Sequence, residues 1–281
     1  MPAPTLPSEN PVVSVASPSG HAIEFDNVRI AFDEKVVLDG ISFHLAHGET
    51  KAVFGVAGSG KSTMLKLAMG LMRPDSGRIF VLGEEVTRMS EQELFELRRR
   101  VGIVFQESAL FDSLRVYENV GFRLTEEGTP ADEIERRVRE VLRFVELERT
   151  YNMFPSELSG GMRRRVAIAR AIITEPEVIL YDSPTGGLDP VTSNTIVELI
   201  MKQRDVYKTS ALMVTHRLQD AFTMATYQFD QATNRMVALP KGQYCDVKMS
   251  FLILRDSKVI FDGDAHQLAT SRDEYIREYI S

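Results

Sequence analysis

The segment GVAGSGKST, residues 55–63, constrains the fold of this chain more than any other feature. It matches the pattern G-x-x-x-x-G-K-[S/T], in which glycines let backbone N–H groups turn inward around phosphate oxygens. The pattern needs a buried strand before it and a helix after it. Residues 50–56, TKAVFGV, form a compact apolar run that favours a buried strand, and residues 61–72 favour a buried helix. The sequence therefore predicts a nucleoside triphosphate site between a strand and a helix.

The polar residues of this segment have distinct expected roles. Lys61 is predicted to reach the β- and γ-phosphates, Ser62 to ligate Mg²⁺, and Thr63 to hydrogen-bond the α-phosphate. The partial positive charge at the start of the following helix adds to the attraction for phosphate. The residues predicted to hold the nucleotide here are Gly55, Gly58, Ser59, Gly60, Lys61, Ser62 and Thr63.

A second apolar run, at residues 178–182, ends in a carboxylate. Its sequence, VILYD, predicts a buried strand that carries Asp182 to the Mg²⁺ ion. A helical pattern at residues 191–207 and another short apolar run at residues 210–216 follow it. Strand, helix and strand in this order predict an α/β fold with a parallel sheet.

The segment LSGGMRRRVAIARAI, residues 158–172, supplies a second glycine-rich turn at a helix start. The residues predicted to bind phosphate in this turn are Ser159, Gly160 and Gly161. Together with the segments at residues 55–63 and 178–182, this turn closely resembles the ATP-binding cassette (ABC) family. The combination of the three segments is far more specific than any one of them.

The resemblance runs from about Ile23 to the C-terminus, and the LSGGQ signature of the family is matched except that Met162 replaces Gln. It implies an α/β P-loop NTPase fold with a RecA-like core, an antiparallel β lobe and an inserted helical subdomain. It also implies ATP and Mg²⁺ as cofactors. Two cassettes of this family pack head to tail, so that each signature turn completes the ATP site of the partner, and a homodimer is expected here.

The resemblance assigns roles to further single residues. It places the ring of Phe32 on the adenine, Gln106 beside Mg²⁺ and the attacking water, and His216 at the γ-phosphate. Asp182 corresponds to the aspartate that holds Mg²⁺ through water, and Asp189 to a residue at the dimer seam. The residues alone leave alternatives open, namely a core phenylalanine, a polar loop glutamine and a structural histidine.

Ser183 is the departure that bears on the chemistry. The family has a glutamate at this position, and that glutamate polarises the attacking water. A serine hydroxyl is no appreciable base near pH 7, and loss of a positioned base typically costs about 10²–10⁴ in rate. Three explanations are open: slow or conditional hydrolysis, a heterodimer with its chemistry at the partner's site, and an engineered substitution. We predict the first, with Ser183 holding the water while Gln106 and His216 orient it.

Composition limits the classes of partner. Hydrophobic residues make up 43% of the chain and charged residues 26%, and the net charge of −7 gives no overall attraction to nucleic acid. The run Arg163–Arg165 is predicted to be a solvated helix face. The one cysteine, Cys245, excludes an internal disulfide framework. No run of about 18 apolar residues occurs, so a transporter would need a separate membrane subunit.

The chain is predicted to divide into a flexible tail at residues 1–20 and the cassette at residues 21–281. An inserted helical subdomain is expected over about residues 90–170, because helical spacing replaces short apolar runs there. Residues 131–147 show this helical spacing, with apolar side chains on one face and Arg and Glu on the other. A C-terminal extension is expected over about residues 227–281. It should contain a hairpin across RDSK and, before it, either a hairpin around ATNR or a surface loop.

Two details narrow the resemblance to one subfamily. Met after the second signature glycine and the segment FQESALFDSLRVYENV, residues 105–120, resemble the lipid-handling cassettes of the maintenance-of-lipid-asymmetry (Mla) type. This implies a membrane permease, a periplasmic lipid-binding MCE subunit and phospholipid movement between two membranes, with the chain at the cytoplasmic face of the inner membrane. Leu110, Phe111 and Leu114 could receive a short permease helix or belong to the subdomain core. A cell-division cassette and an importer subunit for amino acids or ions remain alternatives.

Overall fold

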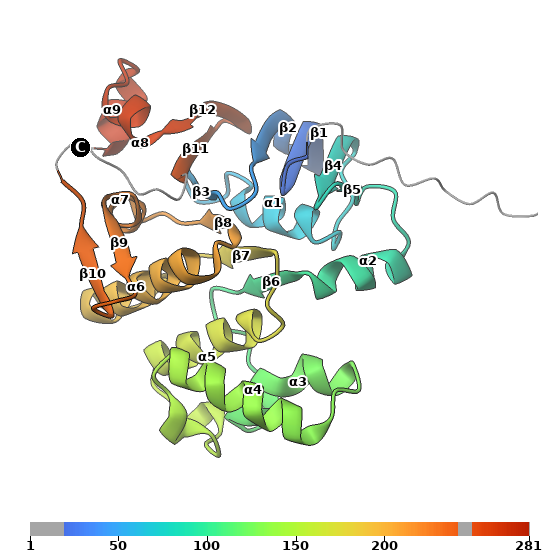
Figure 1. Cartoon of the computed structure of the whole chain (residues 1–281). Coiled ribbons are helices and arrows are strands. Elements are labelled where there is room, and N and C mark those ends of the chain that lie inside the picture. Colours follow the sequence, from blue (N-terminus) through green and yellow to red (C-terminus); the bar gives the residue numbers. More distant parts are fainter. Residues whose placement is uncertain (1–19, 241–248, 281) are drawn as a thin grey trace, which may run out of the picture.

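The computed structural model describes residues 20–240 and 249–280 (Figure 1). Residues 1–19, which make up nearly all of the predicted tail, lie outside these ranges, and so do residues 241–248, which include Cys245. Within the described ranges, no helix has both the length and the apolarity of a membrane span.

The apolar run at residues 50–55 forms strand β3 (Thr50–Gly55), in which every residue is buried, as predicted. It lies inside a sheet with the order β12-β11-β3-β8-β7-β6. The other strands are β6 (Val101–Val104), β7 (Val178–Asp182), β8 (Ser210–Val214), β11 (Met249–Arg255) and β12 (Lys258–Asp264), and α6 (Pro190–Tyr207) connects β7 to β8. Neighbours are parallel except β12, which is antiparallel to β11. The carboxyl ends of β3, β7 and β8 therefore share one edge of the sheet, where α/β proteins bind ligands.

A second sheet, in the order β2-β1-β4-β5, forms the predicted antiparallel lobe. Its strands are β1 (Ile23–Phe32), β2 (Lys35–Leu45), β4 (Ser76–Val81) and β5 (Glu84–Glu85). β1 pairs antiparallel with both β2 and β4, so it is an inner strand rather than an edge. The buried rings of Phe25 and Phe43 stack across β1 and β2 with centroids 4.7 Å apart. They share one apolar core with Val53 of β3 and Met64 of α1 (Lys61–Ala68), which joins the lobe to the parallel sheet.

The helical part lies at the bottom of Figure 1 and contains α3 (Val116–Glu126), α4 (Ala131–Phe144) and α5 (Gly160–Ile172). Between α4 and α5 are the short 3-10 helices η1 (Glu148–Thr150) and η2 (Pro155–Glu157). The stretch expected to be helical from about residue 90 begins with α2 (Glu91–Arg99), but it then contains β6, which pairs with β7 in the parallel sheet. The expectation of helix was wrong there, because the run VGIV is too short to show a period.

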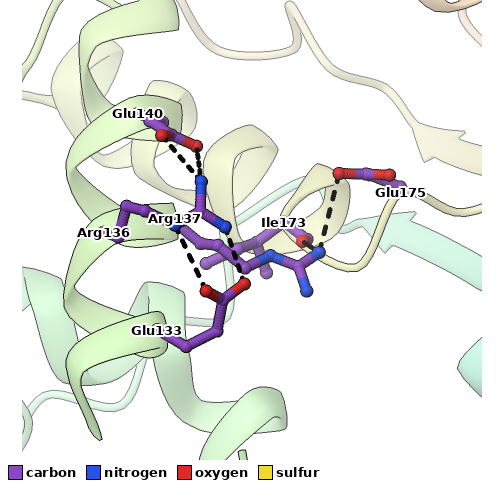
Figure 2. A network of polar contacts seen from close by, with 6 residues as sticks. All are labelled: Glu133, Arg136, Arg137, Glu140, Ile173 and Glu175. Atoms are coloured by element: carbon purple, nitrogen blue, oxygen red, sulfur yellow. Dashed lines mark hydrogen bonds and ion pairs between the residues drawn. The ribbon is translucent and has the colours of Figure 1, made fainter. Parts of the chain in front are cut away.

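Charged side chains on α4 contact each other and the chain that follows α5 (Figure 2). Arg136 donates to Glu133 at 2.7 Å and to Glu140 at 2.8 Å, but these exposed pairs add little stability. Arg137 instead donates to the carbonyl of Ile173 at 2.6 Å. This bond ties the helical part to the loop that enters β7.

The C-terminal region contains two hairpins. After α7 (Leu218–Thr226), β9 (Tyr227–Asp230) and β10 (Arg235–Ala238) pair antiparallel, so a hairpin is the correct alternative for this segment. β11 and β12 form the hairpin predicted across RDSK. Its turn residues, Asp256 and Ser257, both have positive φ, as in the I′ turns that join twisted strands. The helices α8 (Ala265–Ala269) and α9 (Glu274–Ile280) follow.

A buried ion pair joins α6 to the first of these hairpins. The Arg204 side chain is 1% exposed, and its Nε donates to the Asp205 carboxylate at 2.7 Å. The guanidinium also donates to the carbonyls of Met224 and Tyr227. Asp205 accepts from the N–H of Phe229 at 2.7 Å. The pair therefore holds α6, α7 and β9 together.

Replacing Arg204 with Ala is expected to lower the free energy of unfolding by about 3–5 kcal/mol, because it removes the guanidinium that pairs with the buried Asp205 carboxylate and binds the carbonyls of Met224 and Tyr227. Denaturant unfolding followed by circular dichroism measures the change. Glu198→Ala, at an exposed position of the same helix, is the control and should change this free energy by less than about 0.5 kcal/mol. A loss below about 1 kcal/mol for Arg204→Ala would show that the pair behaves like an exposed one.

Candidate nucleotide-binding site

The glycine-rich loop leaves β3 at Gly55 and enters α1 at Gly60. Gly60 has a φ of 93°, and a Cβ there would lie 2.6 Å from Cδ2 of Leu38. Only glycine therefore lets the loop pass this close to β2. Gly60 precedes α1 without a side-chain cap, so the first N–H groups of the helix are available to a ligand. The backbone fits the phosphate cradle predicted from the sequence.

Lys61 points back into this loop. Its Nζ donates to the carbonyls of Gly55 and Val56, both at 2.8 Å, and to Oγ of Ser59 at 3.3 Å. Burial lowers the pKa of the Lys61 ammonium, and the Asp182 carboxylate opposes this shift. Charged phosphate oxygens are stronger acceptors than carbonyls, so a triphosphate in the loop can take over these contacts.

Ser62 and Asp182 meet at the shared edge of the sheet. The Ser62 hydroxyl donates to Oδ1 of Asp182 at 3.2 Å, although the two residues come from α1 and β7. A hydroxyl and a carboxylate are the hard oxygen donors that Mg²⁺ prefers. Among the described residues, no group of three or more His, Cys, Asp or Glu is placed to hold a metal ion. Phosphate and water oxygens would therefore complete the coordination of Mg²⁺ at this pair.

An open cavity of about 650 Å³ adjoins the loop, and nucleotide-sized ligands occupy spaces of this order. Gly58, Lys61 and Thr63 line it on one side, and Phe32 with Lys35 lines it on the other. Phe32 is 42% exposed, so it is not the core phenylalanine that the sequence leaves as an alternative. An exposed ring beside a phosphate loop suits stacking on a nucleotide base.

The signature turn lies elsewhere, at the start of α5. Oγ of Ser159 accepts from the N–H of Met162 at 3.2 Å, and Ser159 is exposed. A Cβ on Gly161 would lie 2.4 Å from Cγ2 of Thr192, so α5 passes close to the start of α6. Asp189 caps α6, and hydrogen bonds from Thr192 lower the pKa of its carboxyl group. The Ser159 turn and Asp189 are thus neighbours, and neither lines the cavity at Lys61.

A family model described as "ABC transporter" matches residues 38–186, which include both glycine-rich turns and Asp182. The chain belongs to the ABC transporter family. Its ATP-binding cassette is therefore an ATPase domain, and the α/β fold expected from the resemblance is confirmed by the sheet order and by the solved structures below. Cassettes of this family bind ATP, dimerise and work with membrane permeases.

Several curated ABC relatives are similar over most of this chain. Protein TRIGALACTOSYLDIACYLGLYCEROL 3, chloroplastic, of Arabidopsis thaliana is 38% identical over 278 residues, which cover 92% of this chain and 72% of the relative. The intermembrane phospholipid transport system ATP-binding protein MlaF of Haemophilus influenzae is 32% identical, covering 92% and 89%. The methionine import ATP-binding protein MetN of Rhodopseudomonas palustris is 44% identical, but covers only 66% of this chain and 50% of MetN.

The solved structures show the same cassette fold. The dimeric post-hydrolysis state of the ATP-binding cassette MJ0796, bound to ADP and Pi, superposes with a TM-score of 0.71 at 28% identity. The match covers 86% of this chain and 98% of that cassette. The resemblance to Mla-type cassettes also has support, because MlaF is among the relatives that match nearly the whole chain.

Ser183, which the ABC resemblance places at the catalytic base position, has an unusual backbone. It is 8% exposed and has a φ of 47°, in the left-handed region that most side chains avoid. Its N–H donates to the carbonyl of Val214 at 2.8 Å, which fixes it against β8. The position is held in place even though the residue lacks a carboxylate.

Gln106 and His216 come to the same edge of the cassette from different strands. Cγ of Gln106, just after β6, lies 3.6 Å from the point that a Cβ on Gly186 would occupy. His216 is exposed and follows Val214, the register partner of Asp182, by two residues. Both residues therefore follow strands of the parallel sheet at the edge that carries Asp182, while their roles stay predictions.

The arginine run of the signature helix is solvated only in part: Arg163 is exposed, as predicted, but the prediction was wrong for Arg164. Arg164 is 4% exposed, and its guanidinium binds backbone carbonyls. The arginines on either side of it also donate to carbonyls outside α5. Helical spacing is the signal that could have found Arg164, because it lies four and seven positions before the buried residues Ile168 and Ala171.

Proposed function

We propose that this cassette binds ATP and Mg²⁺ at the Lys61 loop, pairs with a second cassette and drives a permease that moves phospholipid. The observation that carries the proposal is the separation of two phosphate-binding turns within one chain. The Lys61 loop lines the cavity with Phe32, whereas the Ser159 turn is exposed beside the start of α6. Head-to-tail pairing would bring the Ser159 turn of one chain to the cavity of the other.

The proposed work of each residue follows from its position. Bound Mg²⁺ would supply positive charge that neutralises the β- and γ-phosphates. Lys61 would hold those phosphates, and Ser62 and Asp182 would orient the ion. The hydroxyl of Ser183 can hydrogen-bond a water molecule but cannot take its proton as a carboxylate would, so we expect slow hydrolysis. Most phosphoryl-transfer catalysis comes from positioning and charge, which this site keeps.

The relatives support a lipid as the cargo. MlaF, named for phospholipid transport, matches 92% of this chain and 89% of its own length. MetN proteins, named for methionine import, match 66% of this chain at 44% identity and 92% of it at 32% identity, but cover only 50% and 72% of their own length. A match over nearly the full length of both proteins is the more specific indication of a common task. An importer of a small solute is therefore the second candidate, and a cell-division cassette is the third.

The proposed permease contact lies between β6 and α3. The rings of Phe111 and Phe122 are 44% and 38% exposed, with centroids 4.8 Å apart, beside a cavity of about 290 Å³. Asn119 is fully buried and fixes this segment by accepting from the N–H of Phe111 and donating to the carbonyl of Leu114. Leu110 packs on the apolar core, which fits the core alternative for this residue, whereas the exposed ring of Phe111 fits the permease alternative. A rigid pair of exposed rings suits an apolar helix from a permease.

Phe111→Asp is expected to reduce recovery of the permease with the cassette by about tenfold or more, because it puts a charge in place of the ring that the permease would bury. Affinity purification from detergent-solubilised membranes measures the recovery. Phe95→Asp changes a 56% exposed ring on α2 and is the control. Equal recovery with both variants, at unchanged ATP binding, would place the permease contact elsewhere.

The same purification tests the cargo. Mass spectrometry should identify an integral permease with an MCE subunit and bound phospholipid, at the cytoplasmic face of the inner membrane. A solute permease, or a division-site membrane protein, would contradict the lipid proposal. Either result would leave the ATP site as proposed, because that site does not depend on the cargo.

A further inference from the structure

One buried guanidinium contacts three backbone carbonyls in two segments of the hydrolytic site. Nη1 of Arg164 lies 3.1 Å from the carbonyl oxygen of Ser183 and 3.4 Å from that of Phe105. Nη2 lies 3.3 Å from the carbonyl oxygen of Gly186. The helix that carries Arg164 is α5, which begins at the signature turn. A single side chain thus links the signature helix to the end of β6 and to the turn after β7.

Each of these carbonyls lies in or next to a residue with a predicted role in hydrolysis, or in the turn that contains it. Phe105 directly precedes Gln106, the residue predicted to orient water. Ser183 directly follows Asp182 and occupies the base position. Gly186 closes the turn, because its N–H donates to the Ser183 carbonyl at 2.9 Å. Arg164 therefore contacts the backbone next to Gln106, which is predicted to orient the water, and the backbone of Ser183, which is predicted to hold it.

Ser183 needs this support because its backbone is strained. Its left-handed φ of 47° persists in a residue with a Cβ only where the surroundings fix it. The N–H is fixed by Val214, and the carbonyl by Gly186 and the charged Arg164. Hydrogen bonds from an ionised donor are the stronger kind.

Arg164 is a costly residue to place here. Burial lowers the pKa of its guanidinium, which means that the charge is poorly solvated. Within the described chain, its Nε is buried and has no hydrogen-bond partner. A well-packed apolar side chain is often as stabilising as a buried charge, so stability alone does not account for arginine at this position.

We propose that Arg164 is a positioning residue for ATP hydrolysis, which ties the signature helix to the backbone of residue 183 and to the start of the Gln106 segment. It does not contact the cavity that holds Lys61 and Phe32. Its loss should therefore lower kcat and leave the KM for ATP nearly unchanged. A residue that only supports the fold would instead lower ATP binding and thermal stability together.

The test uses the full chain and its Ser183→Glu variant, with steady-state phosphate release measured over a range of ATP concentrations. Arg164→Gln should lower kcat by about 10–100-fold, since small errors in position are costly in catalysis. The KM should stay within about twofold. Arg164→Lys keeps the charge without the planar guanidinium, so its kcat should lie between those of the parent and Arg164→Gln. Arg165→Lys, a neighbour that donates to the carbonyl of Val145, is the matched control and should keep its rate.

Three results would overturn the proposal. The first is an unchanged kcat for Arg164→Gln in the hydrolysing parent. The second is a parallel loss of ATP binding and melting temperature in both Arg164 variants, which would mean a role in folding only. The third is a parent without any hydrolysis, which would also contradict the ATPase function. The first two leave the proposed ATP site intact, so the two failures are distinguishable.

Discussion

Replacing Ser183 with Glu is expected to raise kcat for ATP hydrolysis by about 10²–10⁴, the usual contribution of a positioned general base. The rest of the machinery is in place, since Ser62 and Asp182 meet at 3.2 Å and Lys61 lies in the loop. The backbone of residue 183 is fixed on both sides, by Val214 and by Arg164. A glutamate there starts from the same strained φ as the serine, so no new backbone cost opposes the gain.

The measurement is phosphate release at saturating ATP and Mg²⁺, with and without the permease complex. Ser183→Gln is the matched control, because it has the length of Glu and no basic oxygen, and it should not raise the rate. A gain that requires a different partner cassette would favour the heterodimer explanation. A natural chain that already hydrolyses ATP within about threefold of Ser183→Glu would contradict the assigned importance of the base.

Lys61→Ala is expected to weaken ATP binding by about 100-fold or more, because it removes charge-assisted hydrogen bonds that contribute roughly 1.5–3 kcal/mol each. ATP-dependent pairing of the cassettes should be lost with it. Titration calorimetry gives the affinity, and light scattering gives the oligomeric state.

Lys66→Ala is the control for this substitution, since Lys66 is exposed on the same helix and keeps the charge count matched. The folding of Lys61→Ala must also be checked, because this substitution removes the donor to the carbonyls of Gly55 and Val56. Melting temperature without nucleotide checks this. An affinity within about threefold of the natural chain would contradict the assignment of the loop.

Local patterns were enough to predict the strand, loop and helix around Lys61. The glycine pattern fits a loop in which Gly60 has a φ of 93°, and the apolar run before it fits a fully buried strand. Few other local structures are compatible with both. The amphipathic helix α4 was predictable for the same reason, since its period is visible over 14 residues. The place of β1 inside the antiparallel lobe, by contrast, depends on its pairing with β4.

Features that depend on distant partners could not be predicted. The four residues of β6 become a strand by pairing with β7, which lies far along the chain. The guanidinium of Arg164 binds the carbonyls of residues 105, 183 and 186, and the sequence of its own helix does not reveal these distant partners. The pair of Thr185 and Asp220, which hydrogen-bond at 2.5 Å, was missed likewise. Side-chain motifs gave the chemistry of the site, whereas its supporting backbone contacts came from the tertiary structure.

The bond from Arg137 to Ile173 has a mechanical consequence (Figure 2). It anchors α4 to the short connection that feeds β7, and the far end of that strand is Asp182. A fully hydrogen-bonded strand resists stretching, so little slack separates the anchor from the carboxylate. We therefore expect a force that a permease applies to the helical part to be transmitted through β7 to the Asp182 carboxylate, the group that we propose orients Mg²⁺.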